Sequence, residues 1–292
     1  MKSVRANGLD IAYLEEGTGP LVVLVHGFPD TAHTWDATMA ALAEAGYRAV
    51  APFLRGYHPT EIPKDGAYDM DTLGRDALGL IEALGAQNAI VVGHDWGATA
   101  AYTATSLDPY RVRLLVTVAI PHPRSIKPTP SAMWKMRHFL GLRGSGAAAK
   151  VRANDFAHVD ELWRRWSPAW KDLPASETAA VRECFAHPGV AEAACAFYAS
   201  LPILTTPKSL RGNIKVPTVS FAGEDDGIMK PRAFEKARHC FDASYEVVQV
   251  PGGHFLHREH PEAFIPELVK VLQQHEQRVR QSSDRAASPH LH

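Results

Sequence analysis

The sequence predicts an α/β protein, with a mostly parallel, doubly wound sheet and an inserted helical segment. Three observations lead to this prediction. Short runs of branched apolar residues alternate with helical patterns over the first 121 residues, and the alternation resumes after residue 217. Between these parts the apolar residues have helical spacing, and no buried strand run occurs. Strands that alternate with helices are typical of a parallel sheet covered by helices on both faces.

The strands are predicted from short apolar runs and the helices from apolar residues at helical spacing. Residues 21–26 form a continuous branched apolar run, which is typical of a strand buried on both faces. Two helices are expected to stop at Gly46 and Gly85, and Pro231 suits the first turn of another. The remaining strands are expected at 47–51, 89–92, 113–119, 218–222 and 245–250, and the helices at 34–45, 71–84, 97–107, 231–239 and 261–274.

The change of pattern divides the chain into three parts. Residues 1–122 and 212–276 are predicted to form one discontinuous core, and residues 123–211 a helical cap on it. Residues 277–292 are polar and are expected to form a flexible C-terminal tail. Four of the six tryptophans lie in the cap segment, at positions 134, 163, 166 and 170. This aromatic content indicates an apolar cleft for a small apolar substrate.

Composition excludes several classes of partner. The chain holds 31 Lys and Arg against 32 Asp and Glu, a net charge of −1, so no nucleic acid partner is expected. The longest apolar run near the N-terminus, residues 21–25, is too short to insert across a bilayer. Residues 1–8 lack the apolar core of a secretory signal, and three cysteines make no disulfide framework. We therefore expect a cytoplasmic protein with reduced thiols.

The most informative stretch is Gly93-His-Asp-Trp-Gly97, which follows a predicted strand and opens a predicted helix. This is the pattern of a nucleophile elbow, with Asp95 in the position where hydrolases more often carry Ser. Glycines flank the nucleophile because the turn is tight and side chains there would clash. A structural turn with a helix-capping Asp is the alternative interpretation.

A second turn is expected at the same edge of the sheet. His26-Gly-Phe-Pro29 follows the strand predicted at 21–26. The backbone N–H of Phe28, together with that of Trp96, would form a two-donor oxyanion hole beside Asp95. His26 itself is interpreted as a buried turn histidine and is given no catalytic role.

These two motifs, with Pro121-His-Pro and the Gly-His-Phe-Leu-His-Arg-Glu-His-Pro-Glu stretch at 253–262, resemble the epoxide hydrolase branch of the α/β-hydrolase family. The haloalkane and haloacid dehalogenases are near neighbours of this branch. The resemblance covers about residues 5–275 and implies the α/β-hydrolase fold. In that fold the triad follows the order nucleophile, acid, histidine. His254, after the last strand, is therefore the candidate base, and the family pattern makes Asp226 the candidate acid, with Asp225 as the alternative.

An Asp nucleophile restricts the chemistry that we expect. A carboxylate that attacks a saturated carbon forms an alkyl ester, which water activated by His254 can hydrolyse at the Asp95 carbonyl. The leaving group is then an epoxide oxygen, which gives a vicinal diol, or a halide. Neither route needs a cofactor. A zinc site among His254, His257 and His260 is not expected, since no carboxylate or cysteine stands at ligand spacing.

Opening an epoxide also requires proton donors in the cap. The resemblance implies two tyrosines there, and Tyr198 matches the second. At the first position stands Lys135, and His138 lies one helical turn away on the same face. Trp134 could donate its indole N–H to a halide, so Trp134, Lys135 and His138 are the candidate substrate-binding residues.

Two alternatives to an epoxide hydrolase remain open. The first is a haloalkane or haloacid dehalogenase with the same triad, for which Trp96 offers an indole N–H beside the nucleophile. Phe28 does not match the asparagine that many haloalkane dehalogenases carry there, and Ala98 and Thr99 stand where haloacid enzymes carry arginines. The second alternative is a non-catalytic binder of a small ligand. The oligomeric state is also open, with a homodimer as one option.

Overall fold

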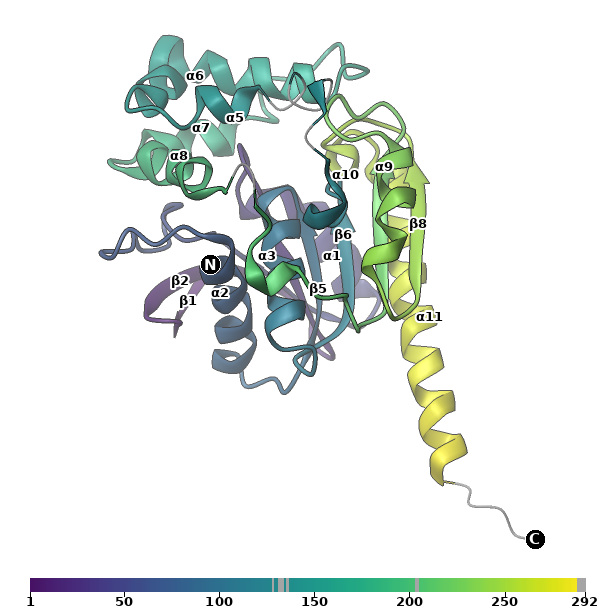
Figure 1. Ribbon diagram of the computed structural model, residues 1–292. Coiled ribbons are helices and arrows are strands. Elements are labelled where there is room, and N and C mark those ends of the chain that lie inside the picture. The colour runs from purple at the N-terminus through teal and green to yellow at the C-terminus, as the bar shows by residue number, and fades with distance from the viewer. Residues whose placement is uncertain (128, 131–133, 135–136, 203–204, 288–292) are drawn as a thin grey trace, which may run out of the picture.

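The computed structural model describes residues 1–127, 129–130, 134, 137–202 and 205–287 (Figure 1). The described residues form one eight-stranded sheet in the order β1-β2-β4-β3-β5-β6-β7-β8. All pairs from β4 to β8 are parallel, so the prediction of a mostly parallel sheet is confirmed. The strands are β1 (Lys2–Ala6), β2 (Leu9–Glu16), β3 (Leu21–Val25), β4 (Arg48–Pro52), β5 (Ala89–His94), β6 (Val112–Val118), β7 (Thr218–Gly223) and β8 (Tyr245–Val250).

Helices cover both faces of the sheet, as a doubly wound fold requires. In Figure 1, α2 and α3 pack together in front of the sheet, and α1 and α11 pack together behind it. The central strands β3 and β5 are buried along their whole length, which explains their continuous apolar sequences. The helices of the core are η1 (Ala32–Trp35), α1 (Asp36–Glu44), α2 (Met70–Ala83), α3 (Trp96–Leu107), α9 (Pro231–Lys236), η4 (Ala237–Cys240), α10 (Leu256–Glu259) and α11 (Pro261–Ala287).

The sequence analysis missed the antiparallel hairpin of β1 and β2. Asn7 and Gly8 connect the two strands with φ values of 44° and 78°. An Asn-Gly pair is a strong signal for such a two-residue turn, because both positions need a positive φ. The strands themselves were missed because β1 is exposed on most of its residues and contains no continuous apolar run.

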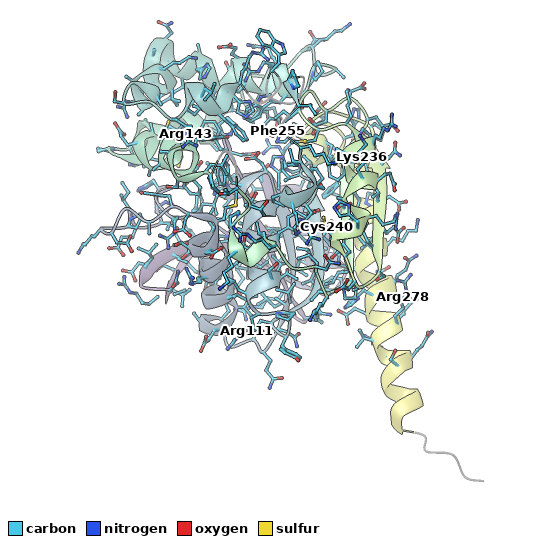
Figure 2. The ribbon with its side chains drawn as sticks, in the orientation of Figure 1. Arg111, Arg143, Lys236, Cys240, Phe255 and Arg278 are labelled. Atoms are coloured by element: carbon cyan, nitrogen blue, oxygen red, sulfur yellow. The ribbon has the colours of Figure 1, made fainter. Side chains whose placement is uncertain are left out.

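The cap lies over the carboxyl ends of the parallel strands (Figure 1). Its described residues form helices and connecting segments, as the apolar spacing predicts, with no strand among them. Figure 2 shows Phe255, from the loop after β8, at the level where cap and core meet. The indole of Trp163 stacks on this ring at 3.8 Å between centroids. The cap helices are η2 (Pro123–Ser125), α5 (His138–Gly141), α6 (Ala147–Trp166), α7 (Ala179–Ala186), α8 (Val190–Ser200) and η3 (Lys208–Leu210).

The last helix is longer than predicted. Its expected end at residue 274 is wrong, because α11 continues to Ala287 through most of the stretch expected to be a flexible tail (Figure 1). Residues 275–287 contain neither Gly nor Pro, so nothing in this stretch breaks the helix. Arg113 on β6 also forms an ion pair with Glu276, which holds the helix against the sheet. None of the helices in the described part of the chain is long and apolar enough to cross a membrane.

Candidate active site

The sharp turn between β5 and α3 presents Asp95 at the carboxyl end of the sheet. Asp95 has φ 51° and ψ −116°, an unusual conformation for a residue with a side chain. The flanking glycines make this turn sterically possible. A Cβ on Gly93 would overlap the carbonyl oxygen of Gly97, and a Cβ on Gly97 would overlap that of Val25. The predicted elbow is therefore present in the structure.

Both oxygens of the Asp95 carboxylate have partners. Oδ1 accepts a hydrogen bond from the backbone N–H of Phe28 at 2.9 Å, and Oδ2 lies 3.3 Å from His254 Nε2. Gly27 permits this approach, since a Cβ there would meet the Asp95 side chain. Trp96 is the first residue of α3, where backbone N–H groups have no acceptor within the helix. The structure thus places both predicted oxyanion-hole residues next to Asp95.

The loops after β7 and β8 bring the candidate acid to the candidate base. His254 Nδ1 lies 3.0 Å from Asp226 Oδ2. The other oxygen of Asp226 accepts hydrogen bonds from the N–H groups of Ile228 at 2.6 Å and Met229 at 2.9 Å. Asp226 and His254 are fully buried, whereas the alternative acid Asp225 is exposed. The structure therefore joins Asp95, His254 and Asp226 in one chain of contacts and leaves Asp225 outside it.

The charges in this chain of contacts support one another. Burial alone would lower the pKa of His254, but the negative charges and hydrogen bonds of Asp226 and Asp95 raise it to about 10. Burial alone would raise the pKa of Asp95, but the hydrogen bond and charge of His254 outweigh it and lower the pKa. The two carboxyl groups beside His254 therefore favour the protonated form of its ring.

A residue that the sequence analysis did not single out connects the cap to both triad loops. The carbonyl oxygen of Trp166, at the end of α6, accepts hydrogen bonds from the N–H of His254 at 3.1 Å and of Gly227 at 2.9 Å. The Trp166 ring also lies 5.3 Å from the His254 ring. No local pattern in the sequence reveals a backbone carbonyl in this role. The position of His254 thus depends on the cap as well as on the core.

Tyr198 faces the nucleophile from the cap. It lies on α8, is 1% exposed, and its ring stands edge-on to Trp96 at 5.3 Å and to Phe28 at 5.1 Å. Burial, followed by the negative charge of Asp95, raises the pKa of its hydroxyl well above the usual range. Tyr57, which the sequence analysis missed, is a second buried phenol whose pKa is raised by burial and by the charges of Tyr198 and Asp95.

The three candidate substrate-binding residues have different outcomes. His138 is buried, with its ring 4.6 Å from the Trp166 ring and 6.1 Å from the Tyr198 ring. Trp134 is not brought to the site: it is 70% exposed, with the Arg137 guanidinium 4.6 Å from its ring centroid. Its indole is covered by a surface cation rather than by the cleft. Lys135 lies outside the described residues.

His26 has the structural position that the sequence analysis expected. Its Nε2 accepts a hydrogen bond from the N–H of Leu54 at 3.0 Å, and its ring is fully buried. Burial is the largest influence on the pKa of this ring and lowers it to about 4, so the imidazole is neutral at pH 7. The hydrogen bond of His26 to Leu54 therefore helps to hold the turn that carries Phe28.

Behind the triad, a group of three buried side chains meets at one point. Asp30, His94 and His257 bring one carboxylate oxygen and two ring nitrogens within 4.8 Å of one another. Asp30 Oδ2 and the Nδ1 atoms of both histidines have no partner among the described residues. One bridging water or a divalent cation would satisfy such a set. The sequence analysis expected no zinc site among His254, His257 and His260. Of these three histidines, only His257 belongs to the group with Asp30 and His94, and His260 pairs with Glu262.

The family model described as the alpha/beta hydrolase fold matches residues 20–261. The chain therefore belongs to the α/β-hydrolase family. It is 42% identical to an epoxide hydrolase of Caballeronia sordidicola over 120 residues. These 120 residues cover 40% of this chain and 36% of that protein. It is 39% identical over 133 residues to epoxide hydrolase A of Mycobacterium tuberculosis, which is 44% of this chain and 41% of that protein. These matches span about two-fifths of either relative's length.

Longer matches agree with the family assignment. The AB hydrolase superfamily protein YfhM of Bacillus subtilis is 29% identical over 282 residues, which cover 91% of this chain and 95% of that protein. The solved structure of epoxide hydrolase A from Mycobacterium thermoresistibile has a TM-score of 0.76 at 25% identity, covering 93% of this chain and 97% of that chain. The Bacillus megaterium epoxide hydrolase, at 22% identity with a TM-score of 0.82 over 94% and 100% of the chains, shows the shared fold.

Proposed function

We propose that the protein hydrolyses an epoxide to a vicinal diol through a covalent ester of Asp95. The observation that carries this proposal is the placement of the Asp95 carboxylate, with Oδ1 on the Phe28 N–H at 2.9 Å and Oδ2 at 3.3 Å from His254 Nε2. The epoxide hydrolases among the relatives support the substrate class. A small apolar epoxide suits the aromatic walls of Trp96 and Tyr198.

In the first step, an ionised Asp95 oxygen attacks a carbon of the epoxide. The carbon–oxygen bond of the ring breaks, and its electron pair stays on the ring oxygen. Tyr198 donates its proton to that oxygen, which yields a hydroxyl on the substrate and a phenolate on the enzyme. The lowered pKa of Asp95 keeps the nucleophile ionised at neutral pH.

Esterification then changes the state of the base. It removes the negative charge of Asp95, one of the two charges that raise the pKa of His254. The pKa of His254 therefore falls, and its proton can return to the Tyr198 phenolate. The neutral imidazole, held by Asp226 through Nδ1, is then ready to accept a proton from water.

In the second step, water attacks the carbonyl carbon of the Asp95 ester and gives its proton to His254. The oxyanion forms on the carbonyl oxygen, where the N–H groups of Phe28 and Trp96 stabilise it. When the ester bond breaks, the leaving oxygen takes up the remaining proton of the added water, so the diol leaves and the Asp95 carboxylate is restored. One oxygen of water has by then exchanged into Asp95.

Trapping the ester tests the proposal. In His254→Gln the first step is retained and the second is blocked, so a substrate such as styrene oxide should leave a stoichiometric adduct on the peptide that contains Asp95, detected by mass spectrometry. Asp95→Ala should give neither adduct nor diol. Asp225→Asn, which alters an exposed neighbouring carboxylate of the triad loop, is the matched control and should turn over normally.

Other outcomes point to the other functions. Turnover by Asp95→Ala, or an adduct on another residue, would refute the mechanism. Halide release from haloalkanes without diol from epoxides would assign the same triad to dehalogenation. Tight ligand binding with no adduct and no turnover over a broad panel would indicate a non-catalytic binder.

A further inference from the structure

A basic cavity lies in the cap beside the candidate active site. Its volume is about 260 Å³, and it lies between α5 and α6. Three of the lining side chains carry a positive charge, and two more are histidines. The lining residues are Arg137, His138, Gly141, Lys150, His158 and Arg165.

The positive charges in this cavity are not balanced by nearby carboxylates. Among the described residues, Arg137, Lys150 and Arg165 form no ion pair. The charge of Glu161 acts on Arg165 and Lys150, and its carboxylate also binds His158 Nδ1 at 2.8 Å, so one carboxylate faces three cations. For a chain with a net charge of −1, three unpaired cations around one cavity are a local excess that an anion would balance.

The guanidinium of Arg165 has buried donor atoms that could bind an anion in this cavity. Its Nε and Nη2 atoms are buried and have no hydrogen-bond partner in the described part of the protein. A guanidinium stays ionised, so buried N–H groups without a partner are costly. Nε and Nη2 form one edge of the guanidinium, and such an edge donates two parallel hydrogen bonds to a carboxylate. The unsatisfied edge therefore has the geometry of a carboxylate receptor.

The cavity is one layer of side chains away from the reaction site. His138 lines the cavity, and its ring contacts Trp166 at 4.6 Å and Tyr198 at 6.1 Å. The Trp166 ring in turn lies 5.3 Å from the ring of His254. The charge of Arg165 also acts on the Tyr198 hydroxyl. His138, Trp166 and Tyr198 are buried between the two places, so a molecule that reacts at Asp95 has to pass these side chains to reach Arg165.

We propose that this cavity binds a carboxylate of the substrate, so that the enzyme acts on epoxides that carry an acidic tail. The inference rests on the proposed epoxide hydrolysis, and it adds the class of epoxide. The carboxylate would accept hydrogen bonds from the Arg165 edge and would be attracted by Lys150 and Arg137. Its apolar chain would lie along Trp166 and Tyr198.

The test compares a terminal epoxide that bears a carboxylate with its methyl ester, which removes the negative charge of the tail and adds one methyl group. The wild-type kcat/KM should favour the acid. Arg165→Gln should lower the ratio of kcat/KM for acid over ester by roughly 10- to 100-fold, the size expected for losing hydrogen bonds to a charged group, and mainly through KM. Lys150→Gln, at an exposed position where folding is not at risk, should lower the same ratio by a smaller factor.

Arg152→Gln is the matched control. It removes one positive charge from the same helix, but Arg152 is exposed, does not line the cavity and pairs with Glu192. The acid-to-ester ratio should stay unchanged in this variant. Melting temperatures of all variants establish that they are folded.

Three outcomes would overturn the inference. The first is equal hydrolysis of both substrates by the wild type. The second is that Arg165→Gln and Lys150→Gln lower the rates for both substrates by the same factor. In either case the proposed epoxide hydrolysis would stand, without a preference for an acidic tail. Calorimetric binding of free hexanoate that depends on Arg165, without preference for the acidic epoxide, would assign the cavity to a separate acid. Loss of diol formation from every epoxide would instead refute the proposed function itself.

Discussion

The two sides of the candidate site differ in how their polar atoms are satisfied. On the core side, every side-chain oxygen and nitrogen of Asp95, His254 and Asp226 has a partner. On the cap side, Arg165 Nε and Nη2 and the Trp166 indole N–H are buried without one. Complete hydrogen bonding holds reactive groups in one geometry, whereas unsatisfied donors favour a ligand that completes them. The core side therefore holds the candidate nucleophile, base and acid in one geometry, whereas the cap side adds Tyr198 and keeps buried donors that a ligand could satisfy.

The backbone explains why the core side is rigid. Asp95 follows the central strand β5, and His254 follows the edge strand β8, which pairs with β7 along its whole length. A Cβ at position 27, 93 or 97 would overlap neighbouring atoms. The cap side is built from helices whose contacts with the core are side-chain stacks and a few hydrogen bonds, such as Trp163 Nε1 to the carbonyl oxygen of Pro29 at 2.9 Å. Variation in the cap away from Trp166, whose carbonyl oxygen holds His254, can therefore change the cleft without disturbing the triad.

The largest effect is expected for the acid on the core side. Asp226→Ala removes the charge and the hydrogen bond that raise the pKa of His254 and hold its Nδ1, so kcat should fall roughly 10³- to 10⁴-fold, as for other triads that lose their acid. Rapid-quench kinetics should show that hydrolysis of the ester is the step that slows. Asp225→Ala serves as the control, and a loss in that variant comparable to Asp226→Ala would contradict the assignment.

A smaller effect is expected for the proton donor on the cap side. Tyr198→Phe removes one hydroxyl while keeping the ring against Trp96 and Phe28, so the rate of ester formation should fall about 100-fold. Single-turnover measurements of the adduct in a His254→Gln background isolate this step. The comparison variant is Tyr57→Phe, which changes the other buried phenol near Asp95. A greater loss in Tyr57→Phe would move the donor role to Tyr57.

The smallest effect concerns Asp30, whose Oδ2 is one of several buried atoms on the core side without a hydrogen-bond partner among the described residues. Burial raises the pKa of its carboxyl to about 6, above that of the unfolded chain. The stability linked to the protonated form is therefore present at low pH and is lost as the pH rises through about 6. Between pH 4 and pH 7, Asp30→Asn should gain about 2 kcal/mol of unfolding free energy relative to the wild type.

Denaturant unfolding of both proteins at each pH measures this difference directly. Comparing the two proteins cancels the titration of groups that they share. A difference that does not change with pH would mean that a bound partner keeps Asp30 ionised with an ordinary pKa, which would make the group of Asp30, His94 and His257 part of the satisfied core.

Much of the core side could be predicted from the sequence alone. The branched run at 21–25 is typical of a buried strand, and a Gly-x-Asp-x-Gly turn between a strand and a helix is the pattern of a nucleophile elbow; the structure has both. The chain order of nucleophile, acid and base predicted His254 and the loop that holds the acid, and the family pattern favoured Asp226 over Asp225. The structure brings Asp95, His254 and Asp226 together. The strand and the turn are determined by residues close together along the chain, where steric limits and periodicity act, whereas the meeting of the triad depends on the fold that these elements form.

The cap side was decided by the tertiary structure. The local pattern predicted helices there, but it could not show that Trp134 faces solvent, that the carbonyl oxygen of Trp166 holds His254, or that Arg165 is buried without a partner. Asp30 meets His94 and His257 for the same reason. Each of these facts depends on contacts between residues far apart in the sequence. Helical periodicity indicates that a side chain is on a buried or exposed face, whereas only the packing of the elements determines which groups meet there.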